Sequence, residues 1–269
     1  MTRAIVTCSR SSTLLDVEEL LSNQRVSRVV VVDNNENPEG LVSEKDVIRF
    51  ILTDNSAREL KEVHAHEVMS SRLFVIKPHS QISTAAEIMI RENISSLLVS
   101  SDKLEGIVTK ADVANYLGAT KRKTRSVVKC MTPNPIAVEP SQSVLSTIQL
   151  MSQNKISRVV VVDQNRELKG IITLADFTLL LLSFCFERTP ATDLLKRTET
   201  AGLTARDFMT TDPFTIDQNS DLTEAARLMT KHHISGLPVT DGSTRLTGIV
   251  GKTDITRAVA FEDKESHWQ

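Results

Sequence analysis

The chain has 269 residues, of which 25% are charged and 40% hydrophobic, a composition that excludes a disordered or collagen-like chain and fits one large domain or two medium ones. The net charge of −2 gives no overall attraction to nucleic acid or to an anionic membrane, so an anionic ligand would need a local site. The cysteines Cys8, Cys130 and Cys185 lack metal-binding spacing, and we interpret them as buried thiols of a reducing compartment.

The sequence indicates neither export nor membrane insertion. The amino-terminal segment has no apolar run followed by a cleavage site, so we expect no signal peptide. The longest apolar stretch, residues 177–186, has ten residues, whereas a membrane-spanning helix needs about 20. We interpret that stretch as a buried helix or a helix at an interface, and we expect a cytoplasmic protein without a membrane partner.

The predicted elements follow one order, best seen in the third of four repeats. A short strand over 135–138 precedes a helix that begins near Ser141 or Ser143 and carries apolar residues at helical spacing. A continuous β-branched run, 159–162, predicts a buried strand. A turn, a second strand over 170–173 and a second helix follow. The order β-α-β-β-α predicts an α/β (α+β) fold with a mixed sheet and helices on one side.

This order recurs along the chain, and the copies are related in pairs. With a shift of 130 residues, residues 13–46 match residues 143–176 at 13 of 34 positions without a gap. The second repeat matches the fourth at a shift of 140. A pair was therefore duplicated, and the pair is the expected domain. We predict repeats at 1–56, 64–120, 126–186 and 203–264, which form two modules, 1–120 and 126–264.

The repeated phrases resemble those of the CBS domain, named after cystathionine β-synthase. The shared features are an apolar–Ser strand start (such as Val26-Ser27), a Gly–apolar–apolar element that ends in Asp (Gly40 to Asp46), and a Met-Thr pair before the first strand (Met131-Thr132). The resemblance implies four CBS repeats in two tandem Bateman modules, similar to the gamma subunit of AMP-activated kinase and its archaeal relatives. It also implies clefts between paired repeats that bind adenosine-containing ligands.

The resemblance implies that the aspartate ending each Gly element binds ribose, namely Asp46, Asp112, Asp176 and Asp254. A carboxylate accepts hydrogen bonds at two oxygens, which suits the two donors of a cis-diol. The alternative is a capping box, in which Ser43, Thr109 or Thr173 begins the next helix and the aspartate is its third residue. In the fourth repeat Gly251 replaces the hydroxyl residue, so this site lacks one side-chain oxygen.

Arginines follow the shared serine in the odd repeats only. Arg28 and Arg158 have Ser96 and Gly236 as counterparts in the even repeats. The resemblance implies that these arginines contact phosphates, which suits the planar fork of the guanidinium group. The alternative is a strand-end arginine that is exposed or paired with a carboxylate. Lys110 stands near a helix start, where a lysine opposes the helix dipole, which hints at an anion bound there. The alternative, which we favour for this residue alone, is a solvated surface lysine.

The resemblance places the adenine at the start of the repeats, with Ser70, Thr132, Ile136 and Thr210 as the predicted contacts. No catalytic motif or metal-binding spacing occurs in the sequence, and we predict no enzyme activity, no metal and no cofactor. The basic run 121–125 is interpreted as a solvated linker rather than a nucleic-acid site.

We therefore expect a regulatory protein that binds AMP, ADP or ATP, forms a homodimer and acts on a protein effector in trans. One alternative is a sensor of S-adenosylmethionine or another nucleoside, and a second is a dimerisation scaffold with empty clefts.

Overall fold

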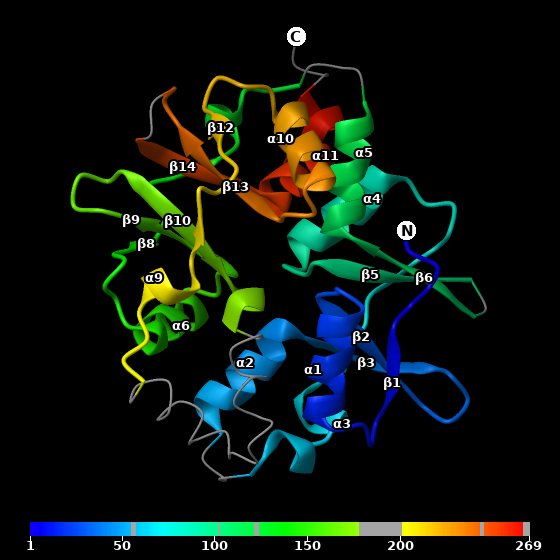
Figure 1. The fold of residues 1–269 in the computed structure, drawn as a ribbon. Coiled ribbons are helices and arrows are strands. Elements are labelled where there is room, and N and C mark those ends of the chain that lie inside the picture. Colours follow the sequence, from blue (N-terminus) through cyan, green and yellow to red (C-terminus); the bar gives the residue numbers. More distant parts are fainter. Residues whose placement is uncertain (55–57, 102, 121–123, 178–200, 243–244, 266–269) are drawn as a thin grey trace.

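The computed structural model describes residues 1–54, 58–101, 103–120, 124–177, 201–242 and 245–265. Four repeats are arranged as a ring around a common middle (Figure 1). The first module comprises β1 (Thr7–Ser9), α1 (Leu14–Asn23), β2 (Arg28–Val32), β3 (Pro38–Ser43), α2 (Glu44–Thr53), the linking turns η1 (Leu60–Glu62) and α3 (Ala65–Val68), then β4 (Val75–Ile76), α4 (Ile82–Arg91), β5 (Ser96–Ser100), β6 (Leu104–Thr109) and α5 (Lys110–Ala119).

The second module repeats this order. It comprises η2 (Val127–Lys129), β7 (Thr132–Pro133), β8 (Ala137–Val138), α6 (Val144–Gln153), β9 (Arg158–Val162), β10 (Leu168–Thr173), α9 (Ala205–Phe208), β11 (Thr210–Thr211), β12 (Ile216–Asp217), α10 (Leu222–Lys231), β13 (Gly236–Thr240), β14 (Leu246–Gly251) and α11 (Lys252–Glu265). A helical turn also begins at Leu174, directly after β10.

Each repeat has a small mixed sheet. Its first strand pairs in parallel with the middle strand, as Val138 does with Val161, and the second hairpin strand pairs antiparallel with it. Residues 159–162 are buried, which confirms the strand that the β-branched run predicted. Ser143 caps α6 by accepting a hydrogen bond from the Ser146 amide. The mixed fold with two tandem pairs of repeats is therefore present, although β8 is shorter than the predicted strand 135–138.

Each repeat also donates a short segment to the sheet of its partner. Strand β7 of the third repeat pairs with β14 of the fourth, and β11 of the fourth repeat pairs with β10 of the third. Bridges from Thr2 to Ile107 and from Ser70 to Leu41 make the same exchange between the first two repeats. The Met-Thr pairs are therefore the crossing points that join the two repeats of a module.

Two kinds of interface close the ring. Within a module the sheets face each other, and their contact buries Val30 with Leu98 in one module and Val160 with Leu246 in the other. Between modules the helices pack: α5 lies on α10, α11 lies on α4 and α5, and α2 contacts α6. The two large cores consequently join the first repeat to the third and the second repeat to the fourth.

The apolar stretch 177–186 is only partly described. Phe177 is fully buried in the core shared by the first and third repeats, and residues 178–186 lie outside the described residues. Among the helices that the structure describes, none combines the length and the apolar character needed to cross a bilayer.

Candidate functional site

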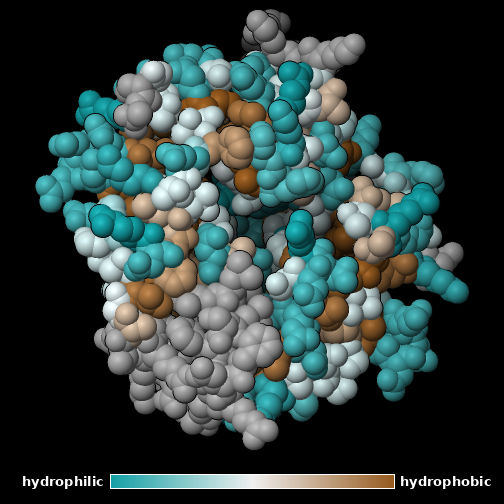
Figure 2. Space-filling model, viewed as in Figure 1, coloured by the Kyte–Doolittle hydropathy of each residue, from teal (hydrophilic) through white to brown (hydrophobic). Residues whose placement is uncertain are grey.

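The predicted residues gather where the second hairpin strand of each repeat meets the following helix. At this junction the last strand residue faces the first residue of the neighbouring strand. The four cross-strand pairs are Arg28–Ser43, Ser96–Thr109, Arg158–Thr173 and Gly236–Gly251. Figure 2 shows a hollow near the middle of this face of the molecule, bordered by hydrophilic side chains.

The predicted aspartates all act as helix caps in the structure. Asp46 accepts hydrogen bonds from the amide and hydroxyl of Ser43, at 2.9 and 2.6 Å. Asp112 and Asp176 are bound in the same way by the threonines three residues earlier. Asp254 accepts the Gly251 amide at 2.8 Å, without a hydroxyl donor at this position. The capping box is therefore present in three repeats, and it fixes one carboxylate oxygen of each aspartate.

The second oxygen of three of these carboxylates has a cationic partner. Arg49 contacts Asp46 at 2.7 Å, Arg257 contacts Asp254 at 3.0 Å, and the amino group of Met1 lies 3.1 Å from Asp112. Each of these groups donates to the oxygen atom that a ribose hydroxyl would use. Ribose binding at these positions would therefore displace or share a cation.

Arg28 and Arg158 form no ion pair with a carboxylate among the described residues. Arg28 donates to Ser27 at 3.0 Å, and burial lowers the pKa of its guanidinium group. Arg158 donates to Ser235 of the fourth repeat at 2.8 Å, and its buried Nε has no partner. Burial lowers the pKa of Arg158 to about 10. The structure thus places two desolvated cations where phosphate contacts were predicted.

Lysines from the helix starts complete the cationic cluster. Burial, together with repulsion from Lys45 and Arg28, lowers the pKa of Lys110 to about 8. Burial, followed by repulsion from Arg158 and Arg28, also lowers the pKa of Lys252 and of Lys45, although most of the Lys45 side chain is exposed. These five side chains come from all four repeats, and their charges act on one another across the middle of the ring.

Polar contacts of this cluster also join repeats of different modules. The Lys110 amine donates to the Thr253 hydroxyl at 3.1 Å, and the Lys45 amine donates to the Lys155 carbonyl at 3.3 Å. Neither contact neutralises the lysine, because a hydroxyl and a carbonyl carry no full charge. Lys45 was not predicted as a site residue, since its counterparts in the other repeats are uncharged and the repeat pattern gave no signal for it.

The residues predicted near the adenine lie on or beside the exchanged segments. Ser70, Thr132 and Thr210 are exposed, and each pairs with the sheet of the partner repeat. Ile136 is half-buried just before β8. Its counterpart in the fourth repeat is Phe214, which is 51% exposed and stacks on His232 with ring centroids 3.8 Å apart. Sequence reasoning missed this aromatic surface, although the shift that relates the repeats aligns the two positions.

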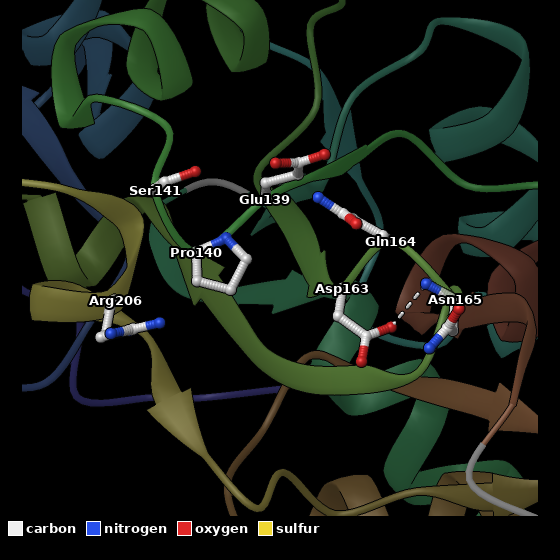
Figure 3. Close-up of a pocket in the computed structure, with 7 residues that line it drawn as sticks. All are labelled: Glu139, Pro140, Ser141, Asp163, Gln164, Asn165 and Arg206. Carbon is white, nitrogen blue, oxygen red and sulfur yellow. Dashed lines mark hydrogen bonds between the residues drawn. The ribbon is translucent and has the colours of Figure 1, made fainter.

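A separate polar depression lies on the rim of the third repeat. It has a volume of about 340 Å³ and is lined by the loops after β8 and β9 together with Arg206 of α9 (Figure 3). Asp163 in this depression binds the Asn165 amide at 2.9 Å and forms an ion pair with Lys169. None of the predicted site residues lines it, so the depression and the cationic cluster are distinct features.

Comparison with known proteins identifies the repeats. The CBS domain matches residues 1–53, 65–119, 125–183 and 205–261. The chain is 23% identical over 273 residues to the uncharacterized protein MJ1225 of Methanocaldococcus jannaschii, covering 96% of both chains. The crystal structure of MJ1225, proposed to be an archaeal homologue of g-AMPK, superposes with a TM-score of 0.83 at 21% identity, over 96% of each chain.

Two further relatives cover the chain less evenly. The uncharacterized protein MJ1404 of the same organism is 26% identical over 263 residues; the match spans 97% of this chain but only 61% of MJ1404. The chloroplastic CBS domain-containing protein CBSX2 of Arabidopsis thaliana is 30% identical over 154 residues, which are 51% of this chain and 64% of CBSX2. CBSX2 has been crystallised in complex with AMP, in a structure that covers 52% of this chain at 28% identity with a TM-score of 0.43.

Proposed function

The chain belongs to the CBS-domain family, and from this premise we propose that it is a non-catalytic regulatory protein that binds an adenine nucleotide in clefts between paired repeats. One observation carries the proposal. Five cationic side chains surround the middle of the ring, and within the described residues none of them forms an ion pair; they are Arg28, Lys45, Lys110, Arg158 and Lys252. Partly buried cations that lack an ion-pair partner are costly, and a bound anion offsets that cost; Lys45 is exposed, and the other four are partly buried.

The surrounding groups suit the other parts of a nucleotide. In the proposed binding mode the phosphates lie toward the cationic middle, and the ribose hydroxyls donate to the aspartates that cap the helices. The adenine lies toward the exchanged strands, where Phe214 offers an exposed aromatic face. AMP, ADP and ATP share these three parts, and a phosphate monoester carries a charge of about −1.5 to −2 near neutral pH.

The wider family supports the ligand class. CBSX2, a sequence relative of half of this chain, has been crystallised with AMP. MJ1225, which shares the four-repeat fold, is proposed to be a homologue of a kinase gamma subunit. A regulatory role follows from the arrangement of the ring, because a ligand at the middle touches elements from several repeats.

The proposed output is a change in the packing between repeats. A ligand shifts a protein only when it binds one conformation more tightly than another. The helix interfaces between modules can supply the second conformation, because Lys110 and Lys45 link opposite modules by single hydrogen bonds at the ligand-facing helix starts. We further propose that the chain acts as a homodimer and transmits this change to a protein effector in trans.

A thermal-shift panel tests the proposal with AMP, ADP, ATP, S-adenosylmethionine and buffer. At 100 times the dissociation constant, binding adds about 2.7 kcal/mol to the free energy of unfolding and moves the midpoint by several degrees. We expect shifts with the adenine nucleotides. A shift with S-adenosylmethionine alone would identify the ligand as a cationic nucleoside instead of a nucleotide. The absence of a shift with every adenosine compound would refute the proposal.

A matched pair of variants separates binding from helix capping. Asp176 and Asp16 accept the same two hydrogen bonds from a threonine, at 2.7 and 2.8 Å, but Asp16 caps α1 away from the cationic cluster. We expect Asp176→Ala to weaken AMP binding at least tenfold while Asp16→Ala leaves it unchanged. Equal losses of affinity in the two variants would assign the effect to stability instead of ribose binding.

A further inference from the structure

Two glycines face each other at the start of β13 and the end of β14. Gly236 and Gly251 are direct cross-strand partners. The equivalent pair of the second repeat is Ser96–Thr109, which carries two side chains at the same place. The fourth repeat therefore lacks both side chains at one point of its sheet, next to the proposed site.

Arg158 of the third repeat fills the space that the two glycines leave. A Cβ atom on Gly236 would overlap its Nη1 and lie 3.0 Å from its Cζ, and a Cβ atom on Gly251 would lie 2.6 Å from Nη1. The Nη2 group donates to Ser235 at 2.8 Å. The guanidinium group is thus held across the boundary between the third and fourth repeats by a slot that any larger residue would close.

The other module has an arginine but no such slot. Arg28 donates only to its neighbour Ser27, and the positions that it would cross to hold Ser96, which is buried, and Thr109. The opposite charges that act on Arg28 are those of Glu44 and Asp46 in its own repeat and, more weakly, of Asp112. The two modules therefore hold equivalent arginines in different ways.

The slot also leaves donors of Arg158 unused. Its Nε is buried without a partner, no ion pair forms with the guanidinium group among the described residues, and Asp254 is the one acid that acts on it at a distance. Rigid positioning removes the entropy cost that a mobile arginine pays when it binds an anion. An anion between the third and fourth repeats would meet a donor that is already in place.

We propose that the Gly236–Gly251 slot is a specificity determinant that fixes Arg158 for the phosphate group of the ligand, so that the module of the third and fourth repeats binds phosphate-bearing nucleosides more tightly than the other module. This inference rests on the proposed function. It adds that the second module selects the phosphate, and it gives the structural reason. Gly236 and Gly251 are positioning residues, because they act through Arg158.

The test compares AMP with adenosine, which lacks the phosphate, by titration calorimetry on the full chain. Gly236→Ser keeps Arg158 but inserts the residue of the second repeat into the slot. We expect it to lower the AMP-over-adenosine preference by about 10- to 100-fold, because losing a hydrogen bond to a charged group weakens binding by about that factor. Arg158→Ala should lower the preference equally, and the combined variant should lower it no further. The matched variant Ser96→Gly, in the other module, opens space beside Arg28 instead of closing it, so it should not lower the preference.

The outcomes are distinguishable. If the unmodified chain binds neither AMP nor adenosine, the proposed function fails. If it binds AMP and Gly236→Ser retains the full preference or binds AMP more tightly, the slot does not position Arg158 for phosphate and this inference is overturned. Should Gly236→Ser fail to fold, Ser235→Ala removes a single hydrogen bond to Arg158 and should lower the preference about three- to fivefold; an unchanged preference there overturns the inference as well.

Discussion

A buried acid on α1 makes the stability of the ring dependent on pH. Glu18 is 2% exposed, and both oxygens of its carboxyl group lack a hydrogen-bond partner in the part of the chain that the structure describes. It lies on the buried face of the helix with Leu14 and Leu21. Burial, and to a lesser extent the charge of Glu44, raises the pKa of Glu18 to about 8. The folded chain therefore favours the neutral form of Glu18.

The sign and size of the effect follow from this pKa. The carboxyl group of an unfolded chain titrates near 4.5, so at pH 4 Glu18 is neutral in both states and costs nothing. Above pH 4.5 the unfolded state loses its proton first, and the free energy of unfolding falls by about 1.4 kcal/mol per pH unit until about pH 8. At pH 7 the cost reaches about 3 kcal/mol. Glu18→Gln should remove this pH-dependent cost while keeping the size of the side chain.

Urea unfolding of both proteins at pH 5, 6, 7 and 8 measures the difference directly. The stability gain from Glu18→Gln should grow steadily with pH across this range. Glu19→Gln is the matched control, because Glu19 is the next residue on α1 and is exposed; its effect should be within about 0.5 kcal/mol at every pH. A gain from Glu18→Gln that is the same at pH 5 and pH 8 would show that the carboxyl group is not held neutral.

Three other expectations follow from particular contacts. Because the pKa of Lys110 is lowered to about 8, its side chain loses its proton and its positive charge as the pH rises through 8. AMP affinity measured by calorimetry should therefore fall between pH 7 and 9, and the fall should be smaller in Lys110→Met. Gly40→Ala should cost about 1–3 kcal/mol in urea unfolding because a Cβ there overlaps Met69, and a smaller cost in a Met69→Ala background would confirm that contact. Ser143→Ala removes the cap of α6 and should lower the free energy of unfolding by about 1 kcal/mol in the same assay.

The local structure of each repeat was predictable because it depends on short-range signals. The run of valines before Asp163 predicted a buried strand, and the serine or threonine three residues before Asp46, Asp112 and Asp176 predicted a helix cap. Both signals act within one turn or one strand, so they do not depend on which repeat packs against which. The pairing of repeats into two modules followed from the duplication.

The contacts between repeats were not predictable from the same signals. The Met-Thr pairs marked the repeats, but nothing in the pattern showed that each pair crosses to the sheet of its partner. A signal for this crossing exists in retrospect: each Gly element packs under a methionine of the partner repeat, as Gly248 does under Met131 and Gly170 under Met209. The glycine and the methionine recur together because the glycine, which has no Cβ, leaves the space that the long methionine side chain fills.

The cationic cluster illustrates the same limit within the site. The arginines and Lys110 were found because they recur in alternate repeats. Lys45 was missed because only the first repeat has a charge there, and its role appears only when the ring brings α2 beside the third repeat. Glu18 was missed for the same reason, since its counterparts Ala86, Ile148 and Ala226 are apolar. A charged residue at a position that is uncharged in the other repeats can be seen in the sequence. The residues that contact it can be known only from the way the repeats pack.

Departures from the repeat therefore carry the functional information that the repeat itself does not. Four identical repeats would form four equivalent sites and give each of them the same affinity for a ligand. In this chain each module has one of the two arginines, but the first module has Lys45 as an additional cation, and Gly236 and Gly251 make room for the arginine of the second module only. If the sites bind the ligand with unequal affinities, as proposed, they fill in order as the ligand concentration rises. A protein of this kind can report graded ligand levels through a single change in packing, because each filled site biases the interfaces that all four repeats share.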